Sequence, residues 1–227
     1  MFTTLKIRLY ILIGLIIMVL GVSIPTILAY FQTQELRGII VQTGDFEVEV
    51  FASFSGVVVD YNSPYYDRDN GSLIVNAYDE LSDNYIGDLE ISVAVTSIVP
   101  SRMRIKLQEQ WTLTRTYLDQ DPLYPIADIV EVLYHNNRGT GYYPFSLLKV
   151  PTSFTPIYDV NGYAYMTDIV PSGETTTFDI IQSGDKYLVK NNEVFSEVCY
   201  LYIDLTIDVV QANRFSEIWG IDPNFYS

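Results

Sequence analysis

The sequence predicts an all-β protein, an antiparallel β-sandwich or jelly roll, on the basis of three observations. Apolar and polar residues alternate with a period of two in several runs after residue 38. Turn signals such as Asn161-Gly and Pro171-Ser-Gly separate these runs. Between them there is no amphipathic helix of about 10–15 residues, such as a parallel sheet requires. We therefore expect one β-domain over residues 45–227, preceded by a hydrophobic helix over residues 1–29.

Strands are expected at residues 46–50, 56–60, 89–98, 102–107 and 199–209. In the last of these, the odd-numbered residues from Cys199 to Val209 are apolar, and the even-numbered ones are Tyr, Asp or Thr. This pattern is typical of a sheet with one face in water, so Cys199 is expected in the core as a small apolar residue. Short helical segments are expected at residues 122–134 and 213–219.

The charge of the chain is divided unevenly and excludes one class of function. The chain has 227 residues and a net charge of -15, but residues 1–29 contain Lys6 and Arg8 and no acidic residue. Removing this leader's charge of +2 leaves -17 on residues 30–227. Nucleic-acid binding needs a basic surface that displaces counterions from phosphates, so we expect no nucleic-acid partner.

The residue inventory also argues against enzymatic chemistry. A Cys/His zinc site takes about four ligands, whereas the chain has one cysteine, Cys199, and one histidine, His135. His135 stands where a strand runs into a turn, and we expect a solvated turn histidine rather than a catalytic base. No serine-hydrolase elbow, zinc-protease motif or phosphate loop is present. We therefore expect a protein that is not an enzyme.

The leader predicts export. Residues 9–29 are almost wholly apolar, which is long enough to cross a bilayer, and the preceding basic residues keep the N-terminus in the cytoplasm. Two interpretations remain open: a signal peptide cleaved after Ala29, or an uncleaved signal anchor. Ala29 suits cleavage, whereas Ile27 is a poor match two positions earlier. Both interpretations place residues 30–227 at the cell surface or outside the cell, with membrane contact only through the N-terminal segment.

Two clusters of charged residues are candidate sites. Asp67, Asp69 and Asn70 form a weak calcium candidate, although the spacing does not fit an EF-hand, and a solvated acidic turn is the alternative. No other cofactor is expected. Arg102, Arg104 and Lys106 share one face of a strand. They either pair with carboxylates across strands, such as Glu47, Glu49, Asp88 or Glu90, or dock on an acidic neighbouring subunit.

Three short segments resemble the TasA/camelysin family of exported proteins. Ile27-Leu-Ala29-Tyr-Phe-Gln-Thr is similar to the junction after the apolar leader in that family. Thr43-Gly-Asp-Phe-Glu-Val-Glu-Val is similar to its first strand. Val210-Gln-Ala-Asn-Arg-Phe-Ser-Glu-Ile-Trp219-Gly is similar to its closing segment. Met103-Arg-Ile-Lys-Leu and Pro171-Ser-Gly-Glu-Thr-Thr-Thr-Phe also fit a middle strand and a loop.

The resemblance implies a jelly-roll subunit of an extracellular filament or biofilm matrix fibre. In that family the segment after the leader can insert as a strand into the next subunit, forming a homopolymer. The corresponding donor here is residues 30–44, and the candidate interface residues are Tyr30, Phe31, Ile39, Ile40 and Val41, together with the Arg102, Arg104 and Lys106 row. The alternative function is a membrane-anchored ectodomain that binds a sugar or a cation.

Overall fold

The structure is a computed structural model, and it describes residues 41–43, 46–118, 123, 125–135, 147–151, 157–158 and 162–226. The chain divides into two compact units, Met1–Gln32 and Thr33–Ser227, and every described residue belongs to the second. Within the described residues, no helix is both long enough and apolar enough to cross a membrane. The expected helix over residues 1–29 lies outside them.

The described part of the chain is built from antiparallel strands with almost no helix, which confirms the all-β prediction. One sheet has the order β1-β2-β6-β12, with β3 paired to β2 beside β1. Its strands are β1 (Val41–Thr43), β2 (Phe46–Phe54), β3 (Val57–Val58), β6 (Leu89–Ser97) and β12 (Glu174–Ile181). Ser55 and Gly56, which join β2 to β3, both have positive φ, as a two-residue hairpin turn of this kind requires.

The second sheet is organised around two long strands. Strands β7 and β14 pair antiparallel along their whole length, from Ser101↔Gln211 to Tyr117↔Phe195. The sheet order is β10-β11-β7-β14-β5-β4, and β8 also pairs with β7. These strands are β4 (Tyr66–Asp67), β5 (Ser72–Asn76), β7 (Ser101–Tyr117), β8 (Ile129–His135), β10 (Ile157–Tyr158), β11 (Ala164–Tyr165) and β14 (Phe195–Gln211).

The remaining elements are short. Strands β9 (Leu148–Lys149) and β13 (Ser183–Gly184) form a two-stranded sheet. The 3-10 helix η1 (Ile86–Asp88) leads into β6, and the helix α2 (Phe215–Trp219) follows β14. This α2 helix ends at Gly220, whose left-handed conformation is the usual way to stop a helix.

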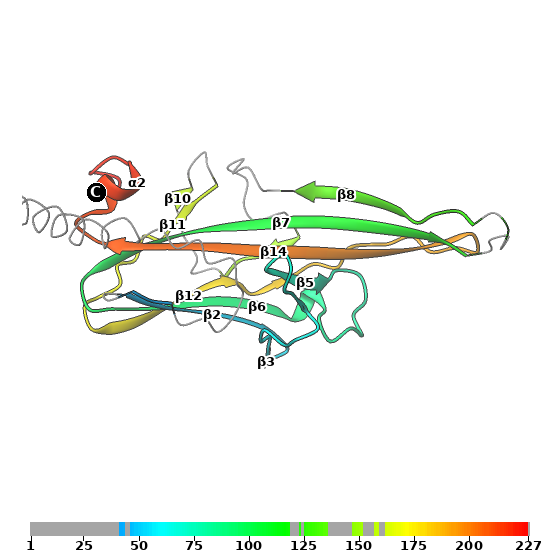
Figure 1. Ribbon diagram of the computed structural model, residues 1–227, viewed down its shortest axis with the longest axis horizontal. Helices are drawn as coiled ribbons and strands as arrows, with labels where there is room; N and C mark the ends of the chain where they lie inside the picture. The colour runs from blue at the N-terminus through cyan, green and yellow to red at the C-terminus, as the bar shows by residue number, and fades with distance from the viewer. Residues whose placement is uncertain are drawn as a thin grey trace, which may run out of the picture. The chain divides into compact units, whose positions relative to one another are not determined.

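The two large sheets bury their inner faces in a common core. Figure 1 shows β2, β6 and β12 as a layer facing β7 and β14. Val93 and Val95 of β6 lie in the same apolar cluster as Ile105 of β7 and Leu201 of β14. Cys199 belongs to this cluster and is fully buried, as the alternation of residues 199–209 predicts. The core therefore fixes which face of the β7–β14 pair points outward.

One predicted element is wrong. The helical segment expected at residues 122–134 is replaced at its C-terminal end by β8, Ile129–His135. Ile129, Val130 and Val132 are β-branched, and the neighbouring edge of β7 supplies hydrogen-bond partners for an extended strand. The second expected helix, at residues 213–219, is confirmed as α2.

Candidate functional site

The outer face of the β7–β14 pair carries cationic, acidic, amide and aromatic side chains. Strict pairing places Arg104 opposite Asp208, Lys106 opposite Thr206, Gln108 opposite Asp204 and Gln110 opposite Tyr202. The Arg104–Asp208 ion pair and Lys106 lie toward one end of this face, and amide, carboxylate and aromatic side chains occupy the middle. The face therefore contains two distinct regions, a cationic one around Arg104 and a polar one around Tyr202 and Asp204.

Arg104 is enclosed by side chains from three parts of the chain: Tyr163 and Tyr165 at β11, Asp208 of β14 and Trp219 of α2. Its guanidinium makes an ion pair with Asp208 at 2.8 Å, and the two side chains are only 9% and 12% exposed. The same Asp208 oxygen accepts a hydrogen bond from Trp219 Nε1 at 2.9 Å. The guanidinium also lies 4.1 Å from the Tyr163 ring centre and 5.0 Å from that of Trp219. Burial lowers the pKa of Arg104, but Asp208 and Tyr165 more than offset this, and the net pKa is raised.

Arg102 and Lys106, the other two members of the cationic row, also contact aromatic rings. Arg102 stacks on Tyr226 at 4.0 Å and donates a hydrogen bond to the Thr167 carbonyl. Lys106 Nζ lies 5.6 Å from the Tyr163 ring centre. The carboxylate that pairs with Arg104 of this row is Asp208 of β14, rather than Glu47, Glu49 or Glu90 of the other sheet or Asp88 of η1. Arg104 is thus enclosed within its own subunit, while docking of the row on a neighbour stays a prediction.

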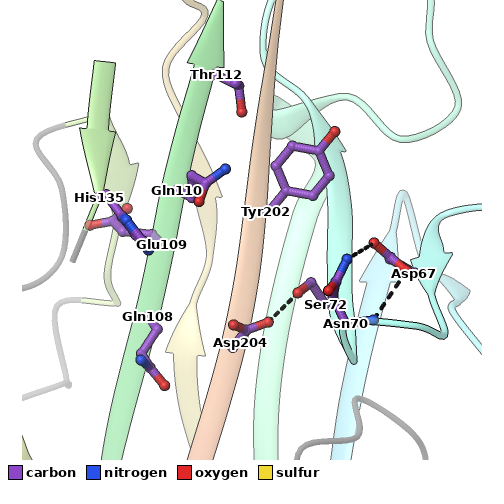
Figure 2. Close-up of a pocket in the computed structure, with 10 residues that line it drawn as sticks. All are labelled: Asp67, Asn70, Ser72, Gln108, Glu109, Gln110, Thr112, His135, Tyr202 and Asp204. Carbon is purple, nitrogen blue, oxygen red and sulfur yellow. Dashed lines mark hydrogen bonds between the residues drawn. The ribbon is translucent and has the colours of Figure 1, made fainter. Parts of the chain in front are cut away.

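A groove of about 550 Å³ occupies the middle of the same outer face (Figure 2). Five strands and the turn between β4 and β5 contribute its lining: Asp67, Asn70, Ser72, Gln108, Glu109, Gln110, Thr112, His135, Tyr202 and Asp204. Cross-strand pairing arranges the central residues in two rows. One row runs Tyr202, Gln110, His135 across β14, β7 and β8. The other runs Ser72, Asp204, Gln108 across β5, β14 and β7.

The two carboxylates at the sides of the groove, Asp204 and Asp67, have pKa values that are shifted in opposite directions. Asp204 is half-buried on β14 and accepts a hydrogen bond from the Ser72 hydroxyl. Burial raises the pKa of Asp204, and the Ser72 hydrogen bond only partly offsets this effect. Asp67 accepts hydrogen bonds from the backbone N–H groups of Asp69 and Asn70 and from the Asn70 amide at 2.7 Å. The Asn70 side-chain bond is the main cause of its lowered pKa.

The predicted calcium residues Asp67, Asp69 and Asn70 therefore form a turn in which one carboxylate binds three donors of its own segment. Calcium takes about six to eight oxygen ligands. Within the described residues, no three His, Cys, Asp or Glu side chains lie close enough together to hold a metal ion. The geometry favours the alternative of an acidic turn, and calcium binding at this position stays a prediction.

Of the remaining predicted residues, the structure describes Val41 and His135. Ala29, Tyr30, Phe31, Ile39 and Ile40 lie outside the described residues. Val41 lies in β1 and pairs with Val48 of its own β2. His135 is the last residue of β8, and its exposed side chain lines the groove.

The groove and the pairing of Arg104 with Asp208 are not among the features predicted from the sequence. Gln108, Gln110, Tyr202 and Asp204 do lie at the outward positions of two alternating strands, which is the available signal. The register between strands about 100 residues apart brings them together. No local sequence pattern predicts this register.

The comparisons with known proteins give no match. No protein-family model matches the chain, and no curated protein or solved structure matches it either.

Proposed function

We propose that this chain is a structural subunit of an extracellular filament, in which the N-terminal segment of one subunit pairs with a sheet of the next. In this proposal residues 1–29 direct export, the two-sheet domain is a jelly roll of the TasA/camelysin kind, and each subunit contacts copies of itself. The observation that carries the proposal is the open edge of β12.

Strand β12 has the properties of an acceptor for another strand. Within the described residues, its backbone pairs with β6 and with no other strand. Natural sheets usually protect such edges with charged side chains, especially lysine, or with proline, a β-bulge or a short length. Glu174–Ile181 has eight residues, three of them consecutive threonines, and contains neither lysine nor proline. Its one irregularity is a register shift between Asp179 and Ile181. This edge is therefore suited to pairing with an added strand.

The N-terminal segment is long enough to serve as that strand. Because Val41–Thr43 pairs with β2 of its own subunit, the segment available for donation ends at residue 40. Residues 30–40 number 11, which span about 36 Å when extended, whereas an eight-residue strand such as β12 spans about 26 Å. Ile39 and Ile40 supply β-branched side chains, and Tyr30 and Phe31 supply aromatic ones.

Assembly must also overcome the charge of each subunit. Residues 30–227 carry -17, so like charges repel whenever two subunits approach. Arg104 is already paired with Asp208 inside the subunit and contributes little to neutralisation between subunits. We therefore expect filament formation to be faster at about 0.5 M NaCl than at about 0.02 M, because salt screens this repulsion.

Negative-stain microscopy of two chains tests the proposal. A chain beginning at Tyr30 should form filaments, and a chain beginning at Val41, which retains β1, should remain dispersed. In the longer chain, Ile39→Asp with Ile40→Asp should abolish filaments. Gln32→Asp with Gln34→Asp, which adds the same charge at polar positions, should retain them. Equal filament formation by the chains from Tyr30 and from Val41 would contradict the strand-donation mechanism.

The alternative, an anchored ectodomain that binds a ligand, is favoured by one observation, the groove on the β7–β14 face. N-terminal sequencing of the exported protein separates the two functions. A first residue of Tyr30 agrees with the filament subunit, and an intact Met1 agrees with the anchored ectodomain.

A further inference from the structure

The groove on the outer face of β7 and β14 has a lining that restricts the charge of its ligand. Asp67 and Asp204 contribute carboxylates, whereas the Glu109 side chain is buried and accepts a hydrogen bond from Trp111 Nε1. None of the lining residues is Lys or Arg. The nearest cation along β7 is Lys106, which lies next to the Tyr163 ring. A phosphate, a sulfate or a uronic acid would meet the Asp67 and Asp204 carboxylates with no Lys or Arg to pair with it. Anionic ligands are therefore unsuited to this groove.

A metal ion fits the lining poorly for a different reason. Asp67 already accepts three hydrogen bonds from its own turn, and Asp204 accepts one from Ser72. The described residues contain no cluster of three His, Cys, Asp or Glu side chains around a common point. The lining instead includes the side chains of Gln108, Gln110, Asn70 and Thr112, which both donate and accept hydrogen bonds.

The central residues suit a neutral ligand with many hydroxyl groups. Figure 2 shows Tyr202 and Asp204 on β14, with Gln110 and Gln108 next to them on β7. Tyr202 offers a half-buried aromatic ring, which can pack against the C–H face of a sugar, while Gln110 and Asp204 can bond its hydroxyls. The row from Tyr202 to His135 crosses two strand spacings, about 10 Å. The volume of about 550 Å³ is in the usual range for small-molecule sites.

We propose that this groove binds a neutral polysaccharide chain, with the Tyr202 ring as its packing surface and Gln110 and Asp204 as hydrogen-bonding groups. The site is separate from the β12 edge and needs no assembly into filaments. A subunit with this groove would attach to neutral glycans whether or not it polymerises.

Saturation-transfer NMR with the full chain tests this proposal, in a zwitterionic detergent that has no sugar head group. The probes are cellotetraose, isomaltotetraose and mannotetraose, with trigalacturonate as the anionic comparison. We expect saturation transfer to at least one neutral probe and none to trigalacturonate. Titration of the bound probe should give an affinity that Tyr202→Ala weakens about tenfold or more, as truncation of a central aromatic contact commonly does.

Two further variants make the result specific. Gln110→Ala should also weaken binding, whereas Thr206→Ala, on the same face of β14 but outside the groove, should leave the affinity unchanged. Far-UV circular dichroism checks that each variant is folded, and Gln110→Ala provides the test if Tyr202→Ala does not fold. The proposal is overturned if no neutral probe binds, if trigalacturonate alone binds, or if Thr206→Ala weakens binding as much as the groove variants.

Discussion

Removal of the Asp208 carboxylate should destabilise the subunit by about 3 kcal/mol, because it leaves the Arg104 charge buried without its partner. Asp208 accepts hydrogen bonds from Arg104 Nε at 3.0 Å and from Trp219 Nε1 at 2.9 Å. Both charged side chains are about nine-tenths buried. Breaking such a pair costs about 3–5 kcal/mol, and the aromatic rings around Arg104 place this case at the lower end.

Urea denaturation followed by far-UV circular dichroism measures this loss, with a chain beginning at Val41 to avoid assembly. For a dependence of about 2 kcal/mol per molar urea, Asp208→Ala should lower the midpoint by about 1.5 M. The matched control is Glu217→Ala, which removes the exposed Arg214–Glu217 pair and should cost less than about 0.5 kcal/mol. Arg104→Met combined with Asp208→Leu should recover part of the stability, since an apolar pair replaces the buried charges while the hydrogen bond from Trp219 Nε1 stays lost. If Asp208→Ala is no more damaging than Glu217→Ala, the buried-pair argument is incorrect.

Three further predictions concern single buried or half-buried groups. Burial raises the pKa of Asp204, so its ionised form costs stability, and Asp204→Asn should raise the melting temperature at pH 7 but not below about pH 4. Arg115 lowers the pKa of Glu197, so Glu197→Gln should lower the melting temperature at pH 7, with the difference lost as the pH falls below about 4. A melting temperature that does not change with pH in this way would contradict either prediction. Burial raises the pKa of Cys199 to about 12, so a maleimide at pH 8 should label this thiol only after urea unfolding. Rapid labelling of the folded chain would show that the thiol is accessible.

The sequence was sufficient to predict the sheets where side-chain alternation is strict. In residues 101–111 the odd-numbered side chains are buried, and in 199–207 they are buried too, as the period of two predicts. The pattern works here because one face packs on the core and the other does not. The alternation did not predict strand β8, because apolar and polar residues do not alternate clearly along it. Its structure depends on pairing with the distant edge of β7.

The candidate sites depend on contacts that local patterns do not contain. Arg104 and Asp208 each stand at a predicted outward position, but they are 104 residues apart in the chain. Trp219 of α2 packs over Arg104 and Asp208, so these two outward-facing side chains are buried. The groove likewise combines residues from β5, β7, β8 and β14, which only the register of the sheet brings together. Sequence alone could predict the polar character of this face but not its concave shape.

Amide hydrogen exchange of β12 in filaments tests the central claim of strand donation most directly. Compared with the dispersed chain beginning at Val41, filaments of the chain beginning at Tyr30 should show slower exchange across Glu174–Ile181, because the outward N–H groups of this edge gain partners. Exchange across residues 199–207 of β14 should be unchanged, since this segment is already paired with β7 in the subunit. Filaments in which Glu174–Ile181 exchanges as fast as in the dispersed chain would contradict donation to this edge.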